Sequence, residues 1–354
     1  MSDTTTAEPE LQVSVRGSLA EVVLNRPKVL NSLSLTMVRE LEHLLDRFET
    51  DAAIRAIWIS GAGDRAFCAG GDIRALYDAG RAGTDLPETF WREEYVLDER
   101  LSRFGKPVIA VMNGITMGGG VGIAGHASQR IAIERTKFAM PEAGIGFFPD
   151  VGASWLLTRK PGEFGTYVAM TGALCGPAET IAAGIADHFV PEARLEALKA
   201  ALASLGPGEG HAEAATTIAG YRQAAQDQMP GAHHALIDRC FAHDRVEDIL
   251  AALSREDDPF ARETRDILLS KSPTSLKITL RLYRQGRMAS SLRECLEREF
   301  AITAGMIAGQ DFYEGVRAAV IDKDRNPRWQ PATLDGVSED TVSSYFIPRH
   351  RPLF

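Results

Sequence analysis

Two short apolar runs near the start of the chain, at residues 11–15 and 19–24, are rich in Val and Leu. An Arg-Gly-Ser sequence separates them, and this combination predicts a β-hairpin. The ten residues before the hairpin are polar and acidic and have no apolar pattern. We therefore expect residues 1–10 to form a disordered tail.

Apolar side chains then recur at helical spacing from Met37 to Phe48. This spacing predicts an amphipathic helix, for which Ser34 or Thr36 is available as the N-cap. Residues 56–59 are continuously apolar and are followed by a glycine-rich turn, which predicts a buried strand.

The alternation of helix and strand patterns continues to about residue 190. Residues 88–103 predict a helix, and residues 107–112, 130–133 and 138–140 predict strands. A glycine triplet at residues 118–120 leads into a helix of small residues. Strands that alternate with helices indicate an α/β fold with parallel pairing.

Strand patterns disappear after about residue 190, and helical patterns replace them. Ser272 followed by proline is a typical N-cap and first helical position. The stretch from Asn326 is rich in proline and predicts irregular structure. The sequence thus predicts an α/β core over residues 11–190 and a helical C-terminal region over residues 191–354.

Composition and charge exclude several classes of function. The 354 residues carry a formal net charge of −9, which argues against binding to nucleic acid or to an anionic membrane surface. No apolar run is long enough to span a membrane. Four widely spaced cysteines and an acidic N-terminus without an apolar or Arg-rich segment indicate reduced thiols and a cytoplasmic protein.

Three segments in the core carry candidate chemistry, and each follows a predicted strand. Residues 66–73 contain two adjacent glycines that can present a peptide N–H to a ligand. The glycine triplet at residues 118–120 precedes a helix, whose first N–H groups lack partners and suit an oxyanion. Taken alone, the first segment is better explained as an ordinary glycine-rich turn, and close helix packing would explain the second.

The third segment, residues 141–150, holds Glu142 and Asp150 among apolar residues and glycines. A carboxyl in an apolar pocket has a raised pKa and can act as an acid or base near neutral pH, and a pair can divide those roles. A lone acid here would be a helix cap. Because the three segments occur in order, together they favour an active site. The glycine triplet is not a Walker A loop, because no Gly-Lys-Ser/Thr follows it, and the segment at residues 66–73 is not GxGxxG. Phosphoryl transfer and dinucleotide binding therefore have little support.

The order and content of these three segments resemble the crotonase (enoyl-CoA hydratase/isomerase) superfamily. Within it, the segments GITMGGGVG at residues 114–122 and IGFFPDVG at 145–152 resemble the branch of 3-hydroxyisobutyryl-CoA hydrolases. The segments at residues 272–280 and 311–324 fit the same branch. The resemblance implies a crotonase-type spiral of ββα units with a helical C-terminal region.

The resemblance also implies roles for individual residues. The thioester oxygen would lie in an oxyanion hole between the backbone N–H groups of Gly71 and Gly119. Glu142 falls at the catalytic glutamate of the superfamily and would either attack the thioester to give a mixed anhydride or deprotonate a water molecule. Asp150 falls at the second acidic position of the hydrolase branch and would orient water, protonate the leaving thiolate or hold the substrate hydroxyl. Glu94 falls at a substrate contact. Alternatively, Glu94 would lie on the solvent-exposed face of its helix and would have no role in binding.

The sequence departs from the hydratases at one informative position. Hydratases generally carry a second glutamate two residues after the glycine triplet, and this chain has Gly122 there. A two-glutamate addition of water is therefore not available, and Glu142 with Asp150 fits the hydrolase pattern. The resemblance to that branch implies hydrolysis of 3-hydroxyisobutyryl-CoA in valine catabolism. Enoyl-CoA hydratase or isomerase activity on a short acyl-CoA is the alternative, and a non-catalytic acyl-CoA-binding protein is a further one.

The implied contacts to CoA come from the loop around Ala69, Gly71 and Ile73. Lys28 is a candidate for the CoA phosphates, as are Arg26 and Lys323, although each also suits a plain surface cation. CoA is part of the substrate, and we expect no separate cofactor and no metal. Members of the superfamily often form trimers or pairs of trimers, so a homo-oligomer is expected.

Overall fold

The predicted N-terminal hairpin is present in the structure, a computed structural model that describes residues 8–226 and 231–354. Strands β1 (Leu11–Arg16) and β2 (Leu19–Leu24) pair antiparallel along their whole length. Residues 1–7 of the expected tail lie outside the described residues. The end of that expected tail is fixed, because Glu10 pairs with Arg26 at 3.1 Å.

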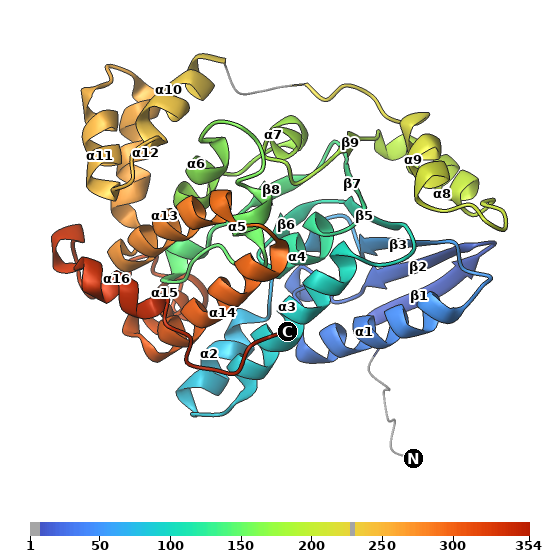
Figure 1. The fold of residues 1–354 in the computed structure, drawn as a ribbon, viewed down its shortest axis with the longest axis horizontal. Coiled ribbons are helices and arrows are strands. Elements are labelled where there is room, and N and C mark those ends of the chain that lie inside the picture. The colour runs from blue at the N-terminus through green and yellow to red at the C-terminus, as the bar shows by residue number, and fades with distance from the viewer. Residues whose placement is uncertain (1–7, 227–230) are drawn as a thin grey trace.

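The larger sheet has the strand order β1-β2-β3-β5-β7-β9 (Figure 1). From β2 onward each neighbouring pair is parallel, as the alternation of strands and helices predicts. The remaining strands of this sheet are β3 (Ala56–Gly61), β5 (Val108–Met112), β7 (Gln129–Ala132) and β9 (His188–Phe189).

Both faces of this sheet are covered, which explains why its strands read as continuous apolar runs. Along β3, Ile57 and Ile59 pack into the cluster that contains α1 (Leu35–Thr50), whereas Ala56 and Trp58 pack into a second cluster. That second cluster includes α8 (Leu195–Leu202) and α9 (His211–Ala219). Residue 190 therefore does not separate two cores, since the helices just after it cover the sheet.

A smaller sheet holds the three strands that precede the candidate segments. Strands β4 (Ala66–Cys68), β6 (Ile115–Met117) and β8 (Lys137–Ala139) are parallel, in the order β4-β6-β8. Because the carboxyl ends of parallel strands meet at one edge, the segments that follow them lie next to one another.

Helices fill the space around the two sheets and form most of the chain after residue 190 (Figure 1). Those before β9 are α2 (Ile73–Arg81), α3 (Leu86–Ser102), α4 (Gly119–Gly125), α5 (Ala153–Leu156), α6 (Phe164–Thr171) and α7 (Pro177–Ala182). After α9 come α10 (Gly231–Phe241), α11 (Val246–Arg255), α12 (Pro259–Ser270), α13 (Pro273–Met288), α14 (Leu292–Ala308), α15 (Gln310–Val316) and α16 (Glu339–Tyr345).

Two details of the C-terminal region test the sequence interpretation. The predicted cap is confirmed, because the Ser272 hydroxyl accepts from the Ser275 N–H at 3.1 Å at the start of α13. The prediction of irregular structure from Asn326 onward is wrong in part, because α16 lies there. The Ser338 hydroxyl caps α16 by accepting from the Thr341 N–H, and Val342 is buried.

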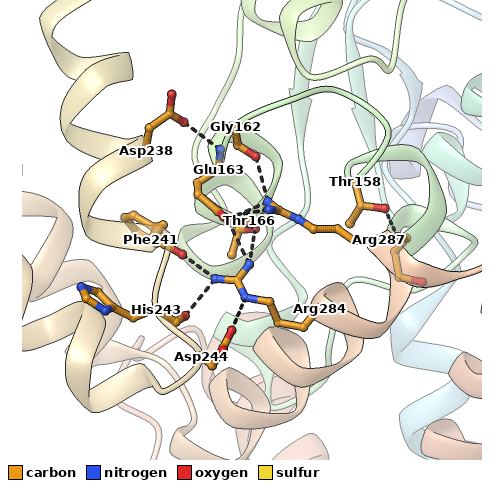
Figure 2. Close-up of polar contacts among 11 residues, drawn as sticks. Thr158, Gly162, Glu163, Thr166, Asp238, Phe241, His243, Asp244, Arg284 and Arg287 are labelled. Carbon is orange, nitrogen blue, oxygen red and sulfur yellow. Dashed lines mark hydrogen bonds and ion pairs between the residues drawn. The ribbon is translucent and has the colours of Figure 1, made fainter.

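A buried ion-pair cluster ties α13 to the core (Figure 2). The Glu163 side chain, at the start of α6, is 8% exposed and accepts from Arg284 at 3.0 Å and from Arg287 at 2.7 Å. Arg284 also donates to the carbonyl oxygens of Phe241 and His243, at the end of α10. Glu163 and Arg284 together therefore connect three helical segments that are distant in the sequence.

We expect Glu163→Ala to lower the free energy of unfolding by about 3 kcal/mol, because it leaves two partly buried guanidinium groups without their carboxylate. Asp257→Asn is the control, since it removes an exposed ion pair and should cost less than about 0.5 kcal/mol. Urea unfolding measures both. Equal, small losses in the two variants would contradict a connecting role for Glu163.

Candidate functional site

The first two candidate segments touch each other at their glycines. A Cβ on Gly118 would lie 3.3 Å from the Gly70 Cα, and Gly70 adopts φ +103°. Only glycine allows this backbone conformation without strain and so close an approach of two main chains. The glycines predicted as a candidate site therefore bring the ends of β4 and β6 into contact.

These segments and the third one surround a cavity of about 120 Å³. The cavity is lined by both glycine segments, by one face of α3 and by the loop after β8. Among the lining residues are seven of the eight that the sequence singled out, namely Ala69, Gly71, Ile73, Glu94, Gly119, Glu142 and Asp150. The rest of the lining is largely apolar and includes Phe90, Trp91 and Phe147.

Two backbone N–H groups are available at this cavity. Gly119 is the first residue of α4, so its N–H has no acceptor within the helix. Gly71 forms an isolated bridge with Leu33. The two hydrogen bonds of this bridge use the N–H groups of Leu33 and Asp72, and not the N–H group of Gly71. Neither group has an acceptor among residues 8–226 and 231–354, so both can donate to a bound oxygen atom.

Glu94 extends from α3 across the start of α4. It is 2% exposed, and its Oε1 lies 2.1 Å from the place that a Cβ on Gly119 would take. Position 119 must therefore be glycine for Glu94 to reach the cavity. Burial raises the pKa of Glu94 well above its usual value, and the nearby Asp150 and Glu142 raise it further. Glu94 does not lie on the solvent face of its helix.

Glu142 begins the short 3₁₀ turn Glu142–Ile145, which follows β8. Its Oε2 atom is buried and has no hydrogen-bond partner among the described residues. Burial raises the pKa of Glu142 well above its usual value, and the charge of Asp150 acts in the same direction. The Lys271 ammonium opposes this shift. Glu142 therefore favours its protonated form.

Asp150 has a different environment from Glu142. Its Oδ2 atom accepts a hydrogen bond from the Tyr95 hydroxyl at 2.6 Å. Burial raises the pKa of Asp150 to about 7, and the hydrogen bond from Tyr95 limits that rise. The two acids of the third segment thus differ in their tendency to ionise.

Two further buried acids were not found from the sequence. Asp98 lies one turn after Glu94 on α3, is fully buried, and has no hydrogen-bond partner for either oxygen among the described residues. Glu299 of α14 accepts from the Gly152 N–H at 2.7 Å and from the Ser154 hydroxyl at 2.5 Å. The i, i+4 spacing of Glu94 and Asp98 was an available signal, whereas nothing local in the sequence marked Glu299.

The basic residues proposed for CoA lie apart from this group. Lys28 is exposed, in the turn Pro27–Val29, and does not line the cavity. Arg26 is engaged by Asp72 at 2.9 Å and by Glu10. Lys271 approaches the site from the C-terminal region, with its Nζ 3.3 Å from the place that a Cβ on Gly144 would take.

Histidines do not contribute to the cavity. His126 is buried and its Nε2 donates to the Val151 carbonyl at 2.8 Å, and burial lowers its pKa to about 4. In the described part of the chain, no group of three or more His, Cys, Asp or Glu side chains is arranged to hold a metal ion. Within the same residues, no helix combines the length and apolarity that crossing a membrane requires.

Comparison with known proteins gives a consistent family. The family model described as Enoyl-CoA hydratase/isomerase matches residues 19–346. The "3-hydroxyisobutyryl-CoA hydrolase, mitochondrial" of Rattus norvegicus is 41% identical over 345 residues, which cover 96% of this chain and 89% of that protein. The "3-hydroxyisobutyryl-CoA hydrolase 1" of Arabidopsis thaliana is 40% identical, over 96% of this chain and 92% of that protein.

Two solved structures share the fold over nearly the whole chain. One is described as a carnitinyl-CoA dehydratase from Mycobacterium thermoresistibile, with a TM-score of 0.91 at 37% identity, covering 98% of each chain. The other is described as an enoyl-CoA hydratase from Rhodobacter sphaeroides 2.4.1, with a TM-score of 0.89 at 37% identity, covering 96% of this chain and 98% of that one. The expected crotonase fold is confirmed.

The structure explains why position 122 is glycine. A Cβ at Gly122 would lie 2.6 Å from the Asp98 Oδ1 atom. We therefore expect Gly122→Ala to lower the free energy of unfolding by about 1–3 kcal/mol through overpacking. In an Asp98→Ala background the same change should be neutral or stabilising, because alanine favours a helix over glycine by up to about 1 kcal/mol.

Urea unfolding of the unsubstituted protein, the two single variants and the double variant measures the effect. Gly105→Ala is the control, since no atom lies within 4 Å of the place its Cβ would take. If Gly122→Ala costs the same with and without Asp98, the carboxyl of Asp98 does not account for the glycine.

Proposed function

This chain belongs to the enoyl-CoA hydratase/isomerase family, and on that basis we propose that it hydrolyses 3-hydroxyisobutyryl-CoA to 3-hydroxyisobutyrate and CoA. Relatives that are 40–41% identical over 96% of this chain are named for that activity. In the setting of valine breakdown, this reaction would release CoA from a short branched hydroxyacyl thioester. The enzyme class is that of an acyl-CoA thioester hydrolase.

One observation supports this proposal most directly. Glu142 and Asp150 line the same small cavity as Gly71 and Gly119, which have free backbone N–H groups. The two N–H groups would form an oxyanion hole for the thioester oxygen. In other enzymes, removal of one such donor raises the activation free energy by about 2.7–4 kcal/mol. Two carboxyls beside it supply the proton transfers that hydrolysis requires.

The hydrogen bonds indicate which acid holds the proton before the reaction. Asp150 accepts from Tyr95, which favours its ionised form, whereas Glu142 Oε2 has no partner among the described residues. Because two nearby buried carboxyls do not ionise together easily, this difference in donors supports placing the negative charge on Asp150. We assign Asp150 as the general base and Glu142 as the general acid.

The reaction then proceeds in balanced steps. Asp150 takes a proton from water while the water oxygen bonds to the thioester carbon, and the resulting oxyanion is held by Gly71 and Gly119. The C–S bond breaks as the sulfur takes the Glu142 proton, giving CoA and the free acid. The proton on Asp150 returns to Glu142, and the product acid ionises to solvent. Glu94, near Gly119, would hold the 3-hydroxyl group of the substrate.

An enoyl-CoA hydratase or isomerase is the second candidate, because two structural relatives at 37% identity are described as a hydratase and a dehydratase. The second glutamate of the hydratases has no equivalent here, because position 122 is glycine and Asp98 occupies the space next to it. This weighs against hydratase activity. Release of free thiol from a series of short acyl-CoAs, compared with hydration of crotonyl-CoA, separates the two candidates. Turnover of neither, with binding retained, would favour the non-catalytic alternative.

CoA binding, cellular location and assembly are further parts of the proposal. Main-chain contacts from Ala69, Gly71 and Ile73 would bind the adenine side of CoA, and Lys28 remains a candidate for its phosphates. Cytoplasmic location and a homo-oligomer, a trimer or hexamer, remain predictions from the sequence. The rat relative is named as mitochondrial.

We expect Glu142→Gln and Asp150→Asn each to lower kcat for CoA release by about 100-fold or more, because each removes one proton transfer. Asp257→Asn, an exposed site, is the matched control and should retain full activity. Near-complete activity in both site variants would contradict the assignment. In a single turnover in ¹⁸O water, label should enter the product; label in the Glu142 carboxyl would instead indicate an anhydride.

The assignment also predicts a pH dependence. A general base acts only when ionised, and the pKa of Asp150 is about 7. We therefore expect kcat/KM for CoA release to fall tenfold per pH unit below an apparent pKa of about 7. The activity should decline again at higher pH when Glu142, whose pKa is raised by burial, loses its proton. A flat profile between pH 5 and 8 would contradict the assignment.

A further inference from the structure

Tyr95 lies behind the site, on the same helix as Glu94 but outside the residues that line the cavity. Its side chain is fully buried, and its hydroxyl lies 2.6 Å from Asp150 Oδ2. In this contact the Tyr95 hydroxyl donates and the Asp150 oxygen accepts. The contact therefore fixes one oxygen of Asp150, a residue that itself lines the cavity.

Acidic groups lie near Asp150 on three neighbouring elements. Glu94 and Asp98 belong to α3, Glu142 to the turn after β8, and Glu299 to α14, and each is electrostatically coupled to Asp150. Tyr283 of α13 is also near enough to sense its charge. These neighbours and the burial of the site disfavour a charge on Asp150. The side-chain donors that oppose them are Tyr95 and, more weakly, Trp91.

Helix α14 contacts both Tyr95 and the residues that follow Asp150. The Thr303 hydroxyl lies 3.3 Å from the Tyr95 hydroxyl. One turn earlier, Glu299 accepts from the Gly152 N–H and from the Ser154 N–H and hydroxyl, immediately after Asp150. The helical C-terminal region thus supports the tyrosine on one side and the loop of Asp150 on the other.

We propose that Tyr95 is a positioning residue that orients the Asp150 carboxylate and keeps it ionised for its role as general base. The proposal rests on the proposed function, because it assumes that Asp150 acts in its ionised form. Residues of α3 and α14 that lie behind the cavity would then set the pH range of the enzyme.

The test is the pH profile of kcat/KM for CoA release by Tyr95→Phe. Loss of one hydrogen bond to a buried carboxylate should move the acid limb upward by about one pH unit. The rate should therefore fall about tenfold at pH 6 and change little at pH 9. A uniform loss at all pH values would mean that Tyr95 only packs, and would overturn the proposal.

Tyr283→Phe is the matched control. Tyr283 is a fully buried tyrosine near the same acids, and its hydroxyl has no hydrogen-bond partner among the described residues. Its loss removes the same atom without removing a bond to Asp150, so the acid limb should stay in place. An equal upward shift in Tyr283→Phe would overturn the proposal, because any buried hydroxyl would then have the same effect.

A second substitution changes the donor strength instead of removing it. Site-specific Tyr95→3-fluorotyrosine gives a more acidic phenol of almost unchanged shape, so the acid limb should move to lower pH. If Tyr95→Phe fails to fold, this variant decides the question, and an unchanged or upward-shifted limb would overturn the proposal. Asp150→Asn distinguishes failure of the proposed function from failure of the role of Tyr95. Full activity in Asp150→Asn contradicts the proposed function itself. An inactive Asp150→Asn together with an unshifted acid limb in Tyr95→Phe contradicts only the role of Tyr95.

Discussion

The parallel pairing of β4, β6 and β8 is the constraint on which the rest of the site depends. Each of these short strands ends in a segment with candidate chemistry, and parallel pairing brings the three ends to one edge. The glycines then allow the first two segments to touch, with the Gly118 and Gly70 backbones in contact. Antiparallel pairing of any one strand would send its segment to the opposite edge and dissolve the cavity.

A second constraint follows from placing several carboxyls inside that edge. Five acids, Glu94, Asp98, Glu142, Asp150 and Glu299, are all less than 9% exposed, and water cannot stabilise their charges. Their donors differ, so their ionisation differs. Asp150 has Tyr95 and Glu299 has three donors near Gly152, whereas Asp98 has no partner among the described residues. Because the carboxyls differ in the number of their hydrogen-bond donors, their pKa values differ, and one can act as a base while another acts as an acid.

The sequence predicted much of this arrangement for identifiable reasons. The hairpin, the parallel core and the Ser272 cap are local patterns of apolar spacing and turn residues, and all three are present. The short helices over residues 153–182 and α16 were not predicted, because their helical patterns are brief or interrupted by proline. The interpretation of residue 190 as the end of the core missed that α8 and α9 cover the larger sheet.

By itself, the sequence determined the family resemblance, the glycine segments and the two acids, since glycine pairs and acids in apolar loops are readable one segment at a time. Only the tertiary structure decided how those acids ionise. Tyr95, Asp98 and Glu299 are separated from Asp150 by 55, 52 and 149 residues along the chain, so no local pattern connects them. The pKa of a buried carboxyl depends on the distances to its donors and to other charges, and folding alone sets those distances.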